Sequence, residues 1–245
     1  MYKQMANIYD ELMQDAPYDE WCKFTEEVIE GKEVRSILEI GCGTGEIAIQ
    51  LAEKGYQVTA FDQSKDMIEV AEQKLNNQEE SCQFDVRDAR YFSYEQTFDT
   101  LISYCDVLNY ITDVNDVELV LKNAYQHLRP GGLFVFDVHS QSYVNWLIDE
   151  EIFSEIRDDI SYVWMCEPLE HEGGIRHDLT FFVKQSDGLY KRLDEEHVQQ
   201  THSVKTYQDL LQNAGFRHVN VYQDFTLDQL VDEEQANRLF FVCEK

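Results

Sequence analysis

Three closely spaced glycines form the most distinctive chemical feature of the sequence. Gly41, Gly43 and Gly45 fall in the segment EIGCGTG, between an apolar run and a segment of helical spacing. Glycine lets the backbone approach a ligand closely and adopt positive φ, so such a turn suits a binding site. Dinucleotide-binding turns follow the spacing G-x-G-x-x-G, whereas here the third glycine comes one residue early, which suits a ligand without a pyrophosphate. The turn alone is equally compatible with a structural strand-to-helix junction.

An acidic residue at the end of the next apolar run strengthens the binding interpretation. Asp62 follows Gly41 by 21 residues, a spacing at which a carboxylate accepts hydrogen bonds from ribose hydroxyls in nucleotide-binding folds. The alternative role is an N-cap on the following helix. Met67 comes five residues later, and its polarisable sulfur can pack against an adenine ring, although a methionine there also suits a core.

A further acid follows the third apolar run. Asp88 lies in the segment DVRDA, where its carboxylate would accept a hydrogen bond from the exocyclic amine of adenine. A solvated surface carboxylate is the alternative. The three features come after successive predicted strands, and ligands bind outside the carboxyl ends of the strands in open α/β sheets. Together they predict an adenosine-containing ligand at one edge of a parallel sheet.

The elements that would position these residues alternate along the chain. From residue 36, short apolar runs are followed by Gly or Asp turns and by segments of helical spacing, a pattern typical of βαβ units on a parallel sheet. The predicted strands are 36–40, 57–61, 82–85, 98–104 and 133–138. The predicted helices are 45–54, a segment capped by Ser64, and a segment that stops at Arg129-Pro130-Gly131-Gly132.

The pattern changes after His139. The segments 160–168, 174–185 and 189–204 are predicted as antiparallel strands joined by glycine-containing turns, with no helix between them. The last of them is polar on both alternating faces, so we expect one face to line a wet cleft. The segment from Tyr207 to Ala214 returns to helical spacing with Gly215 as its stop, and two apolar runs near the end of the chain complete the sheet.

Five segments within residues 35–140 together resemble motifs I to VI of the class I S-adenosylmethionine-dependent methyltransferases. They are ILEIGCGTG, VTAFDQSKDMI, FDVRDAR, FDTLISYCDVLNYI and LRPGGLFVFDV. The resemblance implies an α/β fold with a Rossmann-like, doubly wound seven-stranded sheet of order 3-2-1-4-5-7-6, the last strand antiparallel. The opening segment YKQMANIYDELMQDAPYDEW is similar to a bacterial subgroup with an N-terminal helical cap and a β insertion. We therefore expect a methyltransferase domain at 1–139 and 206–245, with the cap at 1–34. The antiparallel insertion at 140–205 is expected to be a substrate lid.

This resemblance implies S-adenosylmethionine as the cofactor. Gly41, Gly43 and Gly45 would pass beneath its methionine part, with Glu39 near its ammonium group and Asp62 on its ribose. The rest of the expected cofactor set comprises Cys42 in the turn, Gln63 and Met67 near the adenine, Asp88 and the Ala89 backbone at the adenine amine, Tyr104 after the fourth strand, and Tyr2 and Tyr9 over the methyl group.

Catalytic residues are less well specified than binding residues. A sulfonium is already an activated electrophile, so the enzyme chiefly has to align a nucleophile at ~3–3.5 Å from the methyl group and exclude water. A base helps only if the acceptor arrives protonated. The candidates for contact with the substrate are Asp106, Asn109, His139, Tyr143 and His197, for which surface, capping or packing roles are equally compatible. No residue is assigned as catalytic, and the acceptor atom is left open.

The net charge and the composition limit the kinds of molecule that the protein is expected to bind. The 20 Lys and Arg residues against 48 Asp and Glu residues give a net charge of −28, which opposes binding to nucleic acids. The six cysteines include no Cys-x-x-Cys pair, so neither a metal site nor a disulfide framework is expected. No apolar run is long enough to span a bilayer, and the first residues do not resemble a signal peptide. We expect a cytoplasmic protein with a small-molecule substrate and leave its oligomeric state open.

The sequence thus predicts S-adenosylmethionine-dependent methyl transfer to an acceptor that we expect to be a small molecule. A non-catalytic sensor of an adenosine ligand, or an interaction module, is compatible with the same cofactor motifs. An NAD(P)-dependent oxidoreductase is disfavoured, because the glycine spacing differs and no second half-fold follows.

Overall fold

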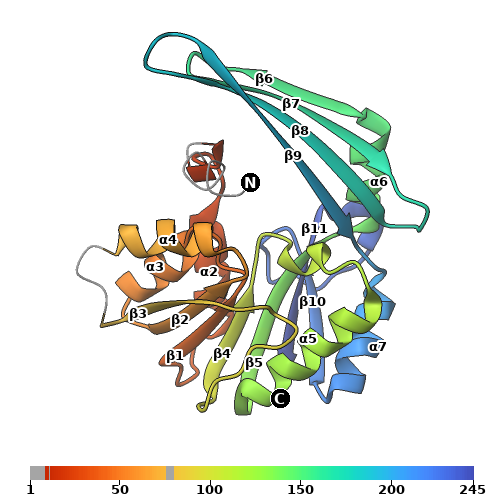
Figure 1. Ribbon diagram of the computed structural model, residues 1–245. Helices are drawn as coiled ribbons and strands as arrows, with labels where there is room; N and C mark the ends of the chain where they lie inside the picture. Colours follow the sequence, from red (N-terminus) through yellow and green to blue (C-terminus); the bar gives the residue numbers. More distant parts are fainter. Residues whose placement is uncertain (1–8, 11, 76–79) are drawn as a thin grey trace.

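The computed structural model describes residues 9–10, 12–75 and 80–245, and its main element is a seven-stranded sheet (Figure 1). The order across the sheet is β10-β11-β5-β4-β1-β2-β3. The strands are β1 (Ser36–Ile40), β2 (Gln57–Asp62), β3 (Cys82–Val86), β4 (Phe98–Ser103), β5 (Leu128–His139), β10 (Arg217–Gln223) and β11 (Arg238–Glu244). The first five pair in parallel, whereas β11 is antiparallel to both β5 and β10. The predicted sheet order and the antiparallel last strand are confirmed.

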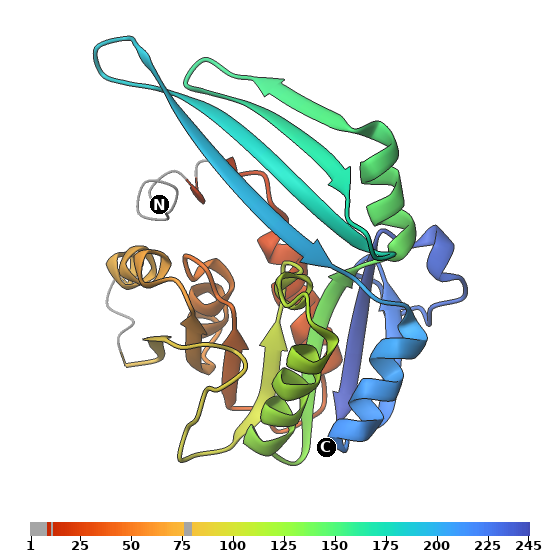
Figure 2. The ribbon, with the colours of Figure 1, turned by 45° about the vertical axis from the view of Figure 1, so that its right-hand side comes forward.

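Helices cover both faces of this sheet (Figure 2). One face carries α2 (Tyr18–Val28), α3 (Glu46–Glu53) and α4 (Lys65–Lys74), and the other carries α5 (Val114–His127) and α7 (Val204–Ala214). Apolar side chains from each helical layer pack on the sheet in a separate core cluster. The predicted helix signals are present, because Ser64 caps α4 by accepting a hydrogen bond from the Met67 amide (3.3 Å) and Gly215 ends α7 at φ 111°.

The strand β5 begins earlier than the sequence predicts. Arg129-Pro130-Gly131-Gly132 was expected to stop a helix, but this segment belongs to the strand, which begins at Leu128. The reason is pairing with the end of β11. The Gly131 amide donates to the Lys245 carbonyl, and the Lys245 amide donates to the Gly132 carbonyl, both over 3.0 Å. These contacts between distant segments extend the strand through residues that favour a turn locally.

The segment after β5 forms a second, four-stranded antiparallel sheet that arches over the first (Figure 1). It comprises β6 (Ile152–Ile156), β7 (Ile160–Pro168), β8 (Gly174–Lys184) and β9 (Tyr190–Gln200). The last three strands agree with the predicted segments, except that β9 ends earlier because Ser203 already caps α7. The sequence analysis missed β6 and the preceding helix α6 (Gln141–Glu150). This helix packs Val144 and Leu147 against Cys166 and Ile175 of the second sheet.

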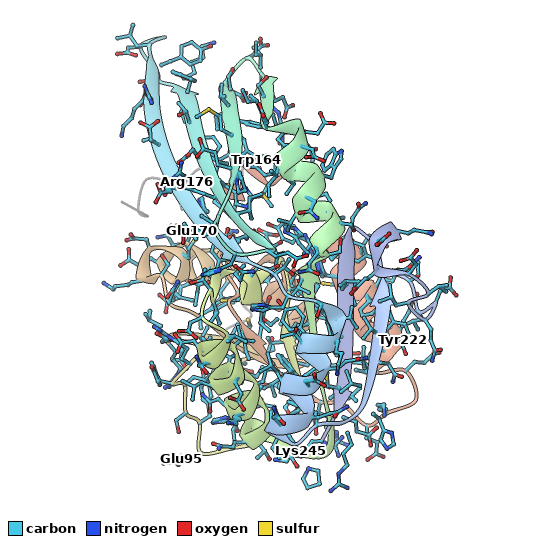
Figure 3. The ribbon with its side chains drawn as sticks, turned by 90° about the vertical axis from the view of Figure 1, so that its right-hand side faces the viewer. Glu95, Trp164, Glu170, Arg176, Tyr222 and Lys245 are labelled. Carbon is cyan, nitrogen blue, oxygen red and sulfur yellow. The ribbon has the colours of Figure 1, made fainter. Side chains whose placement is uncertain are left out.

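The second sheet lies at the end of the molecule where β5 finishes, so it faces the carboxyl ends of the parallel strands. Figure 3 shows Trp164 on this sheet and Lys245 at the opposite end of the molecule. No helix in the described ranges is long and apolar enough to cross a membrane. Within the same ranges, no group of His, Cys, Asp and Glu side chains is arranged to hold a metal ion.

Candidate functional site

A cavity of ≈ 1080 Å³ lies between the strand ends of the large sheet and the second sheet. Its lower wall comprises the glycine turn (41–44), the end of β2 and the residues after it (61–67), and the loop after β3 (87–90). Between the two sheets the cavity is lined by residues 104–107, residues 110–113 and His139. Strands β7, β8 and β9 line it from the side of the second sheet. The predicted cofactor segments and the inward face of the insertion therefore surround one space.

The glycine turn follows β1 directly. Gly41, Gly43 and Gly45 adopt φ of 76°, 53° and 82°, and the amides of Gly41 and Cys42 both donate to the carbonyl of Phe61. A Cβ on Gly41 would approach the Val107 side chain to 2.4 Å, whereas a Cβ on Gly43 would meet nothing within 4 Å. Gly43 thus borders open space. Gly45 does not line the cavity, and a Cβ there would approach Phe84 to 2.6 Å, so packing requires this glycine.

Asp62 ends β2 beside the turn. Its Oδ2 accepts a hydrogen bond from the Gly43 amide (3.0 Å), and its Oδ1 accepts one from the Ser64 amide (2.8 Å). Burial raises the pKa of this carboxyl, while hydrogen bonds from the Ser64, Gly43 and Gln63 amides lower it. The two bonds fix the carboxylate at the cavity wall, and the residue does not cap the following helix, because Ser64 does so.

Glu39 lies on β1 under the same part of the cavity. Only 3% of its surface is exposed, and its Oε2 has no hydrogen-bond partner in the described part of the chain. Burial, and secondarily the charge of Asp62, raises the pKa of Glu39 to about 8. A buried carboxyl with an unpartnered oxygen at a cavity wall is a place where a cationic ligand group would be stabilised.

The loop after β3 carries Asp88, whose carboxylate is held by Arg90. Arg90 donates from Nη2 to Asp88 Oδ2 (2.6 Å) and from Nε to Oδ1 (2.9 Å), and it also reaches Asp116 (2.9 Å). Hydrogen bonds from Arg90 lower the pKa of Asp88. A ligand amine would therefore share oxygens that already accept from Arg90. The cavity is also lined by Ala89, Gln63 and Met67, which the sequence analysis had placed near the adenine.

Two described residues before α2, Tyr9 and Asp10, lie beside the glycine turn and the cavity. Asp10 accepts a hydrogen bond from Thr44 Oγ1 (2.6 Å) and forms an ion pair with Lys74 (2.5 Å). Tyr9 lines the cavity, and burial and the nearby Tyr18 raise its pKa well above the ordinary value. Tyr2, the other predicted tyrosine of the cap, lies outside the described residues.

Tyr104, at the end of β4, lines the cavity although only 2% of its surface is exposed. Its hydroxyl forms a hydrogen bond with Thr25 Oγ1 of α2 (2.8 Å). Cys42 lines the same wall. Both residues therefore border the cavity.

An ion-pair cluster lies at the ends of β4, β5 and β11, where Asp106 lines the cavity and Asp137 and Arg238 lie behind it. Arg238 donates to Asp106 Oδ1 (3.0 Å) and to Asp137 Oδ2 (2.8 Å), and Asp137 also accepts from the Trp21 indole (2.7 Å). Burial alone would raise the pKa of Asp106, but the charges of His139 and Arg238 outweigh it and lower the pKa to about 2. Asp106 is thus a buried, ionised carboxylate whose Oδ1 is already paired.

A chain of hydrogen bonds joins this cluster to the second sheet. Gln199 of β9 donates from Nε2 to Asp106 Oδ2 (2.7 Å), and its Oε1 lies 3.2 Å from His177 Nε2. Trp164 Nε1 lies 3.0 Å from His177 Nδ1. An indole nitrogen only donates, so Nδ1 is the acceptor and the neutral His177 carries its proton on Nε2. The chain therefore runs from Trp164 through His177 and Gln199 to Asp106.

The remaining predicted substrate residues divide into two groups. His139 and His197 line the cavity. Asn109 and Tyr143 do not: Asn109 is 1% exposed, and its amide bonds the Gln200 carbonyl (3.0 Å) and the His139 amide (3.0 Å). Tyr143 packs on His139 from α6, with ring centroids 4.9 Å apart. In this structure, Asn109 and Tyr143 support the wall rather than form it.

Several residues of the site escaped the sequence analysis: Asp10, Thr44, Asp137, His177, Glu195, Gln199 and Arg238. One signal was available, because Asp137 interrupts the otherwise apolar run LFVFDV and a buried carboxylate requires a cationic or hydrogen-bonding partner. That Arg238 supplies the partner follows only from the pairing of β11 with β5. The inward positions of β9, among them Glu195, His197 and Gln199, line the cavity, which accounts for the polar face of this strand.

The family model described as a methyltransferase domain matches residues 37–132. The chain is 38% identical over 247 residues to YqeM of Bacillus subtilis strain 168, a protein named as a methyltransferase. The match covers 100% of this chain and 97% of YqeM. A solved S-adenosylmethionine-dependent methyltransferase from Clostridium acetobutylicum has a TM-score of 0.87 at 25% identity, covering 99% of this chain and 98% of that one. CalS10 of Micromonospora echinaspora, an amino pentose methyltransferase solved with bound S-adenosylmethionine, has a TM-score of 0.76 at 16% identity, covering 97% of each chain. The fold, the glycine turn with its adjoining carboxylate, and this full-length likeness agree: the chain belongs to the class I S-adenosylmethionine-dependent methyltransferases, and S-adenosylmethionine is its cofactor.

Proposed function

We propose that this protein transfers the methyl group of S-adenosylmethionine to a small-molecule acceptor bound under the second sheet. The observation that carries the proposal is the single cavity of ≈ 1080 Å³, whose walls combine the glycine turn, Asp62 and the inward face of β7, β8 and β9. This volume lies at the upper end of the range for small-molecule and cofactor sites. It leaves room for a small acceptor beside the cofactor.

The residues at the strand ends fit the cofactor. The unpartnered Oε2 of Glu39 suits the ammonium group of its methionine part, because a cation there would compensate a buried carboxylate. The backbone at Gly43 leaves space in which a ligand can lie directly on the chain. Asp62, fixed by two amides, has further lone pairs for the ribose hydroxyls.

The adenine end is assigned to the loop after β3 and to α4. Gln63, Met67 and Ala89 line this part of the cavity, and we place the adenine among them. Arg90 keeps the Asp88 carboxylate ionised, so that it can accept from the adenine amine in addition to Arg90. Cys42, Tyr9 and Tyr104 are assigned to the wall around the methionine part and the methyl group.

The bound cofactor supplies a methyl group on a sulfonium, which is activated without further help. The work left to the chain is to align the acceptor and to exclude water. In this proposal the insertion, residues 140–205, serves as the lid over the acceptor, and Asp10 borders the glycine turn through its hydrogen bond with Thr44. CalS10, whose fold is shared, acts on an amino pentose, which supports an acceptor of small size.

The test is formation of S-adenosylhomocysteine by purified protein supplied with S-adenosylmethionine and a fractionated bacterial extract. We expect release with the small-molecule filtrate and none with the retained macromolecules. Calorimetric titration with S-adenosylmethionine and, separately, NADH is the accompanying control, and only the former should bind. Binding without release in any fraction would favour a sensor, and release with the macromolecules alone would contradict a small acceptor.

A further inference from the structure

The two halves of the cavity differ in the positively charged side chains that line them. Lys65, Arg87 and Arg90 line the cofactor half. The rest of the wall is formed by residues 9, 12, 13 and 18, by residues 104–107, 110–113 and 139, and by the insertion, and no lysine or arginine of the described chain lines it. Arg238 lies behind this wall, where Asp106 and Asp137 neutralise it. An acceptor with a carboxylate or phosphate group would therefore find no cationic partner among the residues of this wall that the structure describes.

The same wall offers groups that attract a cation. Glu195 lines the cavity from β9, and its carboxylate makes no hydrogen bond or ion pair with the side chains described. The rings of Tyr110, Tyr162 and Trp164 face the same space, and aromatic rings stabilise a nearby ammonium ion by cation–π interaction. The chamber thus has an available negative charge and apolar walls.

Of the three histidines at this wall, only His197 has nitrogens available to a ligand. His177 uses Nδ1 for the Trp164 indole and Nε2 for Gln199. His139 accepts from Arg238 at Nε2 (3.1 Å), and its Nδ1 is buried, with no hydrogen-bond partner in the described part of the chain. The ring of His197 packs edge-on against Tyr110, with centroids 5.8 Å apart, and forms no hydrogen bond within the described chain.

We propose, on the basis of the function proposed above, that the acceptor is a small amine that enters as its ammonium ion, is held by Glu195 and is deprotonated by His197. Glu195 and His197 are two residues apart on β9, so both side chains point to the same face. In the register of the sheet, His197 lies opposite His177 and Glu195 opposite Leu179. The base and the charge partner therefore come from adjacent inward positions of one strand.

The surroundings of His197 suit this role. Burial lowers the pKa of His197, while the charges of Glu195 and Asp106 raise it, and His177 is the other titratable group that faces it from β8. The lowered pKa keeps the imidazole neutral and able to accept a proton at neutral pH. Once the imidazolium forms, the carboxylates of Glu195 and Asp106 stabilise it.

The step balances without any further reactant. A proton moves from the ammonium nitrogen to His197, and the freed lone pair forms the N–CH₃ bond. The S–CH₃ bond breaks, and its electron pair stays on the sulfur, which becomes a neutral thioether. The methylated product leaves as an ammonium ion, and His197 returns its proton to water.

The substrate class is tested with three matched sets of acceptors: benzylamine, benzyl alcohol and benzoate; glucosamine, glucose and glucuronate; putrescine, butanediol and succinate. We expect S-adenosylhomocysteine release with at least one amine and with none of its alcohol or carboxylate counterparts. Release with alcohols or carboxylates alone overturns the amine assignment and leaves the proposed function intact. No release with any of the nine, from protein that binds S-adenosylhomocysteine, counts against the amine assignment, while the extract assay judges the proposed function separately.

The base is tested by His197→Gln on the best amine. At neutral pH we expect kcat/KM to fall by about 10²–10⁴-fold. The loss should shrink as pH rises toward the pKa of the amine, because more acceptor then arrives unprotonated. His171→Gln, at an exposed turn of the insertion, is the matched control and should behave as the wild type. A loss of equal size at every pH would assign His197 a structural role and overturn the proposal.

Binding gives a readout independent of turnover. In calorimetry on the complex with S-adenosylhomocysteine, Glu195→Gln should weaken binding of the same amine about tenfold, as expected for loss of one charge-assisted contact, and leave binding of its alcohol counterpart unchanged. Equal weakening of both would show that Glu195 shapes the chamber without recognising charge, and the ammonium assignment would be wrong.

Discussion

The backbone amide of Gly43 donates a hydrogen bond to Asp62 Oδ2 over 3.0 Å, which joins the turn after β1 to the end of β2. The two features that indicated a nucleoside ligand in the sequence are therefore in direct contact. The bond orients the carboxylate along the cavity wall, and it requires the Gly43 amide to point toward β2. Two residues far apart in the chain thus act as one structural unit.

The glycines of the turn should respond differently to alanine. Gly43→Ala adds a methyl group in open space, so the protein should fold with a cost of only about 1–2 kcal/mol for the left-handed conformation, while S-adenosylhomocysteine binding falls strongly. Gly45→Ala places a Cβ 2.6 Å from Phe84 and should destabilise the fold more. Thermal unfolding and calorimetry on both variants check this contrast. Similar unfolding temperatures with similar affinities would contradict it.

Glu39 should make the ligand-free protein less stable as pH rises. The unfolded chain ionises near the ordinary pKa of 4.5, whereas the folded protein holds this proton to about 8. Between these values the folded state binds more protons, so the free energy of unfolding decreases with rising pH. Glu39→Gln should remove this contribution and raise the unfolding temperature at neutral pH, by about 2–4 °C for each kcal/mol gained.

The measurement for Glu39 is a series of thermal unfolding scans across pH 5 to 8 on both proteins, followed by cofactor titration. The variant should be more stable yet bind S-adenosylhomocysteine more weakly. A variant that is both less stable and equally competent in binding would show that Glu39 is a structural residue.

Arg238 should be essential for stability. Asp137 is fully buried, and it accepts hydrogen bonds from the Arg238 guanidinium, the Trp21 indole and the Asp106 amide, of which only Arg238 is a cation. Arg238→Met leaves a buried carboxylate without its cation, which should cost about 3–5 kcal/mol. Denaturant unfolding measures the loss, and Arg238→Met combined with Asp137→Asn should recover part of it. A loss below about 1 kcal/mol, typical of an exposed pair, would contradict the buried cluster.

Gln199 should fix the second sheet to the first. Gln199→Leu removes the donor to Asp106 and the acceptor for His177, so amides of β8 and β9 should exchange hydrogen faster while β1 and β4 stay protected. Glu196→Gln, at an exposed position of the same strand, is the control and should leave exchange unchanged. Unaltered protection in Gln199→Leu would mean that other contacts hold the second sheet in place.

The large sheet could be predicted because its signals are local. Each strand of the parallel half is a short apolar run with its own turn, and Ser64 and Gly215 mark helix ends by their own chemistry. The position of Gly43 and Asp62 beside one cavity could be predicted for the same reason, because both residues lie at ends of strands that the sequence delimits. Features built from distant segments were harder, as the extension of β5 by pairing with Lys245 illustrates.

The acceptor half could not be derived from the sequence for a physical reason. Whether a histidine is a base depends on its partners, and His139 and His177 are engaged by Arg238, Trp164 and Gln199 from other strands. Nothing in the local sequence of His197 distinguishes it from them. The role of Asn109 also depends on tertiary packing, because its buried side-chain amide forms hydrogen bonds with the backbone of Gln200 and His139.

The central claim is that Asp62 binds the ribose hydroxyls of the cofactor. Calorimetric titration of S-adenosylhomocysteine into wild type and Asp62→Ala tests it most directly. Loss of two hydrogen bonds to a charged acceptor should weaken binding about 100-fold, with unfolding still cooperative and with Asp158→Ala, at an exposed position, binding as the wild type does. Unchanged affinity in Asp62→Ala would contradict the account.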